Sequence, residues 1–148
     1  EQAAKLERQW QAMGMYTEIF FRAEVDEYAF TTLRSLSEGR RPGDDPHPLW
    51  LDDRCESLPR GGSCYFPSAN HFAAEREDFG FGPPSFHVSF RGNLKNYDGT
   101  IEAFFDWVAP HLADRGFVGY SLYEEDDLPT AYVWDGEQYA GIAPLVKP

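Results

Sequence analysis

The chain has 148 residues, with 13 Lys and Arg against 25 Asp and Glu, which gives a formal net charge of −12. Aromatic residues make up 16% of it, whereas disordered acidic segments are poor in them, so a folded domain is predicted. The charge balance disfavours direct nucleic-acid binding, which needs clustered Lys and Arg, and no apolar run reaches the roughly 18 residues of a membrane span.

Residues 1–12 combine a helix-forming composition with few apolar side chains, and we expect them to be an extension to a single domain over residues 13–148. Apolar and polar side chains alternate over residues 16–25, which predicts a half-buried strand. Asp26 can then cap a helix that ends at Gly39, because its carboxylate can accept a backbone N–H bond.

Residues 39–85 are expected to form an irregular insert. They hold six Gly and seven Pro, which interrupt any long helix or strand. A short strand over residues 64–66 is the one regular element expected there. A long irregular stretch inside a compact domain is often functional.

Regular elements return after the insert. Residues 86–91 alternate like a strand, and apolar residues at +3, +4, +7 and +11 from Ile101 indicate a helix that stops near Ala109, before Pro110. Three more strands are expected at 117–123, 130–134 and 137–140, the last two joined by a turn at Asp135 and Gly136.

This order favours an α+β fold with a single antiparallel sheet of about five strands and two helices on one face, in the split β-α-β arrangement of ferredoxin-like domains. The helices are expected to cover Ile19, Phe21, Val25, Phe86, Val88 and Phe90. The opposite, open face of the sheet would present Glu18, Phe20, Arg22, His87, Ser89 and Arg91.

Cys55 and Cys64 are the only cysteines, far fewer than a secreted disulfide scaffold carries. Reduced thiols in a cytoplasmic protein are the favoured interpretation, and a single bridge between them is the alternative. His47 and His71 flank the pair, but the spacing matches no zinc motif. We therefore predict neither a metal nor another cofactor.

Five short motifs carry a family resemblance: MGMYTE at 13–18, NLKNYDG at 93–99 running into the helix through Trp107, then GYS at 119–121, YEE at 123–125 and LPT at 128–130. Together they resemble a group of small uncharacterised proteins of bacteriophages, prophages and their bacterial hosts. The resemblance covers the start and the last third of the chain. It implies a native start near Met13 and a host-directed or counter-defence role, and it supplies no catalytic residues.

Charge is unevenly distributed along the chain. Residues 97–148 hold ten acids and two bases, against fifteen acids and eleven bases in residues 1–96. Ordinary solubility would explain this, but an acidic face that meets a basic partner is the sharper hypothesis, because complementary potentials select partners. Aromatic side chains dominate the energetics of such interfaces. The expected partner-binding residues are Tyr123, Glu124, Glu125, Asp126, Asp127 and Trp134.

The sequence thus favours a non-enzymatic protein-binding module, which the resemblance would make a phage-related inhibitor of a host or defence protein. An immunity-type protein that neutralises a cognate toxin would use the same physics and stays open. A small enzyme is the third alternative, although no nucleophile motif supports it. Its residues on the open sheet face would be Glu18, Arg22, His87 and Arg91. The sequence indicates no oligomeric state.

Overall fold

The computed structural model describes residues 16–40, 49, 57–60, 69–76 and 83–140. Its elements come in the order β1 (Tyr16–Val25), α2 (Glu27–Ser37), α3 (Ser57–Arg60), β2 (Ala69–Arg76), β3 (Pro84–Lys95), α4 (Thr100–Val108), η3 (Ala109–His111), β4 (Gly116–Tyr123), β5 (Thr130–Trp134) and β6 (Tyr139–Ala140). The fold is α+β, as predicted. None of the described helices is long and apolar enough to cross a membrane.

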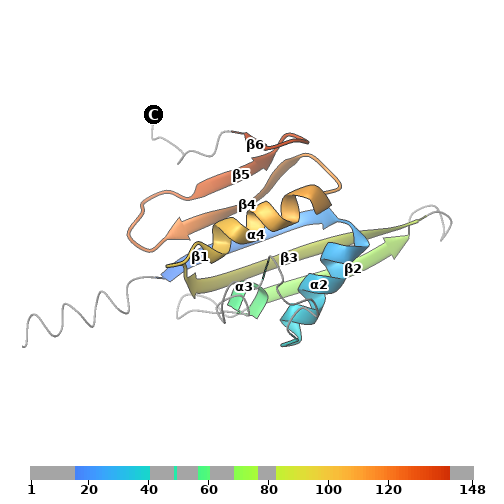
Figure 1. Ribbon diagram of the computed structural model, residues 1–148, viewed down its shortest axis with the longest axis horizontal. Helices are drawn as coiled ribbons and strands as arrows, with labels where there is room; N and C mark the ends of the chain where they lie inside the picture. Colours follow the sequence, from blue (N-terminus) through green and yellow to red (C-terminus); the bar gives the residue numbers. More distant parts are fainter. Residues whose placement is uncertain (1–15, 41–48, 50–56, 61–68, 77–82, 141–148) are drawn as a thin grey trace, which may run out of the picture.

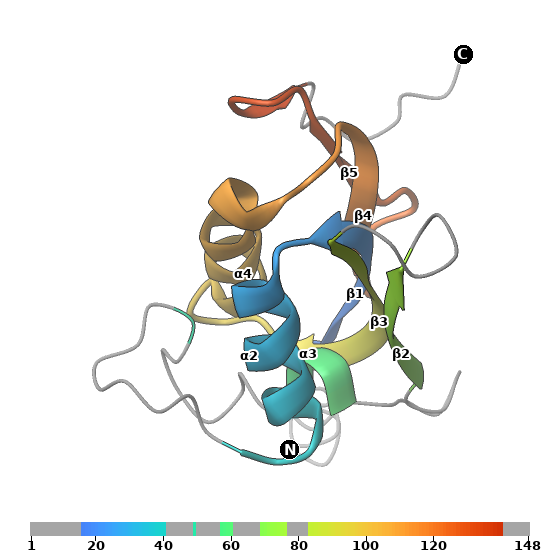
Figure 2. The same cartoon turned by 90° about the vertical axis from the view of Figure 1, so that its right-hand side faces the viewer.

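The strands form one antiparallel sheet in the order β2-β3-β1-β4-β5-β6. β1 lies at its centre and pairs with β3 along its whole length, from Tyr16 opposite Lys95 to Val25 opposite Phe86. On its other side β1 pairs with β4. The helices α2 and α4 lie on one face of this sheet, as Figures 1 and 2 show. Because β3 is antiparallel to both β1 and β2, these two strands are parallel to each other, with β3 between them.

The hydrophobic core lies between the sheet and the two helices. Every second residue of β1 points into it, and Phe21 packs edge-on against Phe104 of α4, with ring centroids 5.0 Å apart. The buried strand residues include Ile19, Phe21, Val25, Val88 and Phe90, and α2 contributes Ala29, Phe30, Leu33 and Leu36. The predicted apolar faces of β1, β3 and both helices are confirmed, with Phe86 only partly buried against this core.

Local chemistry explains where the two helices begin and end. Oδ1 of Asp26 accepts the backbone N–H of Ala29 at 2.9 Å, which caps α2 as predicted. At the start of α4, Oδ1 of Asn96 accepts the backbone N–H of Ile101 at 2.8 Å. Pro110 cannot continue an α-helix, and the chain tightens into the single 3-10 turn of η3.

At Gly119, β4 lies close to the backbone of β1 and to the Phe105 ring of α4. A Cβ atom at this position would clash with the carbonyl oxygen of Phe20 and would lie 3.2 Å from Cζ of Phe105. The ring of Phe105 stacks on Tyr132 of β5, with centroids 3.6 Å apart and planes 6° from parallel. The hydroxyl of Tyr139 donates to the carbonyl of Phe105 at 2.5 Å. These contacts join β5 and β6 to the helix layer.

The expectation of an irregular insert over residues 39–85 is wrong in part. β2 and the short α3 lie inside it, so the sheet has six strands rather than about five. β2 has the sequence ANHFAAER, in which Phe72 is the one large apolar residue, and such a strand shows no alternating pattern. The strand expected over residues 64–66, both cysteines and residues 1–12 lie outside the described residues.

Candidate functional site

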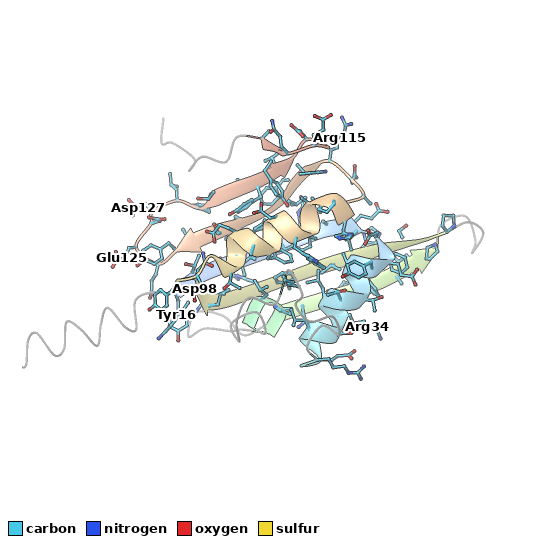
Figure 3. All side chains as sticks on the ribbon, viewed as in Figure 1. Tyr16, Arg34, Asp98, Arg115, Glu125 and Asp127 are labelled. Atoms are coloured by element: carbon cyan, nitrogen blue, oxygen red, sulfur yellow. The ribbon has the colours of Figure 1, made fainter. Side chains whose placement is uncertain are left out.

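Four consecutive acidic residues form the turn between β4 and β5. Glu124, Glu125, Asp126 and Asp127 are all exposed. The turn is tied to β1, because the backbone N–H of Glu124 donates to the carbonyl of Tyr16 at 3.2 Å. Figure 3 shows Glu125 and Asp127 at the same end of the molecule as Tyr16 and Asp98. We call this region the acidic end; it comprises Tyr16, Tyr97, Asp98, Tyr123, Glu124, Glu125, Asp126 and Asp127.

Three tyrosines stand among the carboxylates of the acidic end. Tyr16 is 36% exposed and Tyr97 is 48% exposed. Tyr123 is half-buried, and its pKa is raised first by this burial and then by the negative charge of Glu125, with smaller effects of Tyr97, Glu124 and Asp126. The acidic end therefore offers aromatic contact area as well as charge.

A small hollow of about 250 Å³ opens beside these tyrosines, between the start of α4 and the sheet. Its walls are stiffened by Asn96, whose Nδ2 donates to both carboxylate oxygens of Glu102, at 2.8 and 3.1 Å. The residues lining it are Thr17, Asn96, Tyr97, Glu102, Ser121 and Tyr123. A concave hollow thus lies beside two tyrosines of the acidic end, Tyr97 and Tyr123.

Trp134 is not brought to the acidic end. β5 begins after the acidic turn, and Trp134 is its last residue, opposite Gly116 at the far end of β4. The ring of Trp134 packs against Tyr139, with centroids 5.1 Å apart, and it is only partly buried against the core. Five of the six expected partner-binding residues are therefore neighbours, and the sixth is a packing residue elsewhere.

Two of the four candidates on the open face, Glu18 and Arg91, form a salt bridge with each other. Nη2 of Arg91 lies 3.1 Å from Oε1 of Glu18, across β1 and β3. The other carboxylate oxygen of Glu18 accepts a hydrogen bond from the hydroxyl of Tyr120. The pKa of Tyr120 is raised to about 12, first by burial and second by this hydrogen bond to Glu18. Phe20 stacks on the Tyr120 ring at 5.5 Å, so this part of the face is a packed network.

The other two candidates, Arg22 and His87, line a hollow of about 430 Å³ on the same face, which we call the open-face hollow. Further polar residues lining it are Glu24, His71, Ser89, Asp114 and Arg115. His71 escaped prediction as a site residue of this face because it lies on β2, which was not expected. Asp114 and Arg115 lie in the loop before β4, where no periodic pattern places a side chain.

Comparison with known proteins adds nothing to this geometry. No protein-family model matches the chain, and no curated protein or solved structure is significantly similar to it. Within the part of the chain that the structure describes, no three His, Cys, Asp or Glu residues are placed to hold a metal ion. The acidic end and the open-face hollow are therefore the candidate functional sites of the described residues.

Proposed function

We propose that this protein is a binding module that holds a basic partner protein through its acidic end. The observation that carries the proposal is the placement of exposed Tyr16 beside the four consecutive carboxylates at one end of the sheet (Figure 3), with exposed Tyr97 beside Tyr123 in the lining of the small hollow. The carboxylates would speed and orient the encounter, and the tyrosines would supply contact area at a low cost in side-chain entropy.

The charge distribution supports a basic partner. Residues 97–140 hold ten acids and a single base, Arg115. In Figure 3, Arg115 lies at the opposite end of the molecule from Glu125 and Asp127. A protein that normally binds nucleic acid has a surface of the required kind, because closely spaced carboxylates can stand in for phosphates.

The sequence resemblance to phage and prophage proteins favours a host or defence protein as the partner, in the cytoplasm. An immunity-type protein would use the same surface against a toxin, and the identity of the partner separates the two. We also infer that the first four strands form the split β-α-β arrangement of ferredoxin-like domains. The order β2-β3-β1-β4 with alternating directions supports this, and β5 and β6 would extend it beyond β4.

The test compares two variants of equal net charge. Glu125→Lys with Asp127→Lys reverses charge at the acidic end, whereas Glu75→Lys with Glu137→Lys reverses two exposed acids that lie away from it. A partner is first captured from host lysate on the wild-type protein and then purified, and its dissociation constant is measured for all three proteins at low and moderate salt.

We expect the acidic-end variant to bind the purified partner about tenfold more weakly at low salt, a change of about 1.4 kcal/mol, and the control variant to bind like wild type. Moderate salt should reduce the difference, because it screens exposed charges. Equal weakening in both variants would mean that net charge, and not the acidic end, determines binding, and would refute the proposal.

A further inference from the structure

The open-face hollow is built on one row of side chains that crosses three strands. The register places Ser89 of β3 opposite both Arg22 of β1 and His71 of β2. The three side chains point away from the helices, because their chain neighbours Phe21 and Val88 are buried in the core. Neighbouring strands lie about 4.8 Å apart, so the row spans roughly 10 Å. Ser89, the smallest of the three, stands in the middle and offers a hydroxyl between a guanidinium and an imidazole.

The guanidinium of Arg22 is positioned to bind an anion. Its guanidinium carbon lies 5.5 Å from the centroid of the Phe117 ring. Among the described residues, no carboxylate comes within ion-pair distance of this guanidinium. A guanidinium placed over an aromatic ring keeps its N–H groups available to bind a phosphate or carboxylate.

Carboxylates stand one row further along the same hollow. Glu24 lies opposite His87, two residues beyond the row of Arg22. Asp114 comes beside it, because the backbone N–H of Ala113 donates to the carbonyl of Glu24 at 3.0 Å. Two residues along a strand correspond to about 6.6 Å. The hollow therefore has a row of hydrogen-bond donors, which we call the donor row. About 6.6 Å from it stand two carboxylates that can accept hydrogen bonds, which we call the acceptor end.

Two other charged or titratable groups border the hollow. Arg115 also lines the hollow, and its charge adds to the backbone N–H bonds that chiefly lower the pKa of Asp135. His87 lies opposite Glu24, in the row of the acceptor end. With neutral histidines, the lining charges of Arg22, Arg115, Glu24 and Asp114 cancel, which disfavours a simple anion.

We propose that the open-face hollow binds a small amphoteric molecule. Its phosphate or carboxylate would lie on Arg22, Ser89 and His71, and an ammonium group about 6 Å away would lie on Glu24 and Asp114. The volume of about 430 Å³ falls in the range of small-molecule sites. This site is separate from the acidic end and does not depend on the function proposed for it.

Amide chemical shifts of the whole chain test the proposal, with O-phosphoethanolamine, 4-aminobutyrate, inorganic phosphate and ethanolamine as probes. We expect saturable shifts at Arg22, His71 and Ser89, and an affinity at least fivefold higher for O-phosphoethanolamine or 4-aminobutyrate than for phosphate. The better of these two identifies the anion that the site prefers. Ethanolamine alone should bind most weakly, because it lacks the group that Arg22 recognises.

Two variants and a control locate the site. Arg22→Gln should weaken O-phosphoethanolamine binding at least tenfold, whereas Arg34→Gln, which changes an exposed arginine on α2, should leave it unchanged. Glu24→Gln should lower the affinity for O-phosphoethanolamine to that for phosphate. Equal affinities for these two probes in the wild type, or binding that survives Arg22→Gln, would overturn the proposal.

Discussion

Asp26 and His111 join the beginning of α2 to the end of η3. Oδ2 of Asp26 lies 2.7 Å from Nδ1 of His111, and the backbone N–H of Asp26 donates to the carbonyl of His111 at 3.0 Å. The other carboxylate oxygen caps α2 at Ala29. Tyr28 and Trp107 flank the imidazole, with ring centroids 5.1 and 5.5 Å away. Asp26 thus links the beginning of α2 to η3, the 3-10 turn that follows α4.

Replacing Asp26 by Ala should lower the free energy of unfolding by about 1–2 kcal/mol, because the helix cap and the contact with His111 are both lost. Urea denaturation at neutral pH measures the change. Asp26→Asn keeps a capping oxygen and should cost less. His111→Ala combined with Asp26→Ala completes a double-mutant cycle, and a coupling energy near zero would show that the pair does not stabilise the fold.

Gly119→Ala should destabilise the protein by about 1–3 kcal/mol or more, because the new methyl group meets the backbone of Phe20 and the ring of Phe105. Gly99→Ala is the comparison, since Gly99 has a φ of +72° and a Cβ there would meet only Glu102, at 3.6 Å. Gly99→Ala should therefore lower the free energy of unfolding by about 1–2 kcal/mol through backbone strain, without a steric clash. Thermal unfolding that ranks Gly99→Ala as the worse variant would contradict the close approach of Phe20 and Phe105 to Gly119.

Stability should fall at alkaline pH partly through Tyr120. Its pKa is about 12 in the folded protein and about 10 in the unfolded chain, so folding favours the protonated phenol. This contribution is fully present below pH 10 and disappears as the pH rises toward 12. Urea midpoints at pH 9 and pH 11 should differ less in Tyr120→Phe than in wild type, with Tyr28→Phe as the control. An unchanged difference in Tyr120→Phe would exclude this role.

Trp134→Ala should reduce stability and leave partner binding intact. The ring packs against Tyr139 far from the acidic turn, and it is only partly buried. The cost should therefore fall below the about 3–5 kcal/mol typical of fully buried aromatic residues. Chemical denaturation and the partner titration are measured on the same sample. A large loss of affinity in protein that is still folded would return Trp134 to the interface.

The sequence predicts elements well where one face of an element is buried. Residues 16–25 alternate because β1 buries every second side chain, and the apolar spacing from Ile101 reflects the packing of α4. β2 escaped prediction because Phe72 is its one large apolar side chain. β2 pairs with β3 along its whole length, and no local sequence pattern records this long-range pairing.

The same division holds for the candidate sites. The acidic turn could be predicted because four consecutive charged residues are exposed in almost any fold, and their effect needs no long-range contact. The position of Trp134 depends on the register of β4 and β5, which the sequence does not display. The open-face hollow joins residues from β1, β2, β3 and a loop, so it appears only once the strand order is known.

The central place of β1 has a consequence for synthesis on the ribosome. β1 is made before every other described element, yet its two neighbouring strands are β3 and β4, and β4 ends at Tyr123. At about 5–20 residues per second, Ile19 and Phe21 wait for about 5–20 seconds before both neighbours exist. The nascent chain therefore exposes the apolar face of its central strand for longest, and a ribosome that stalls before residue 116 releases a product whose central strand has lost one neighbour.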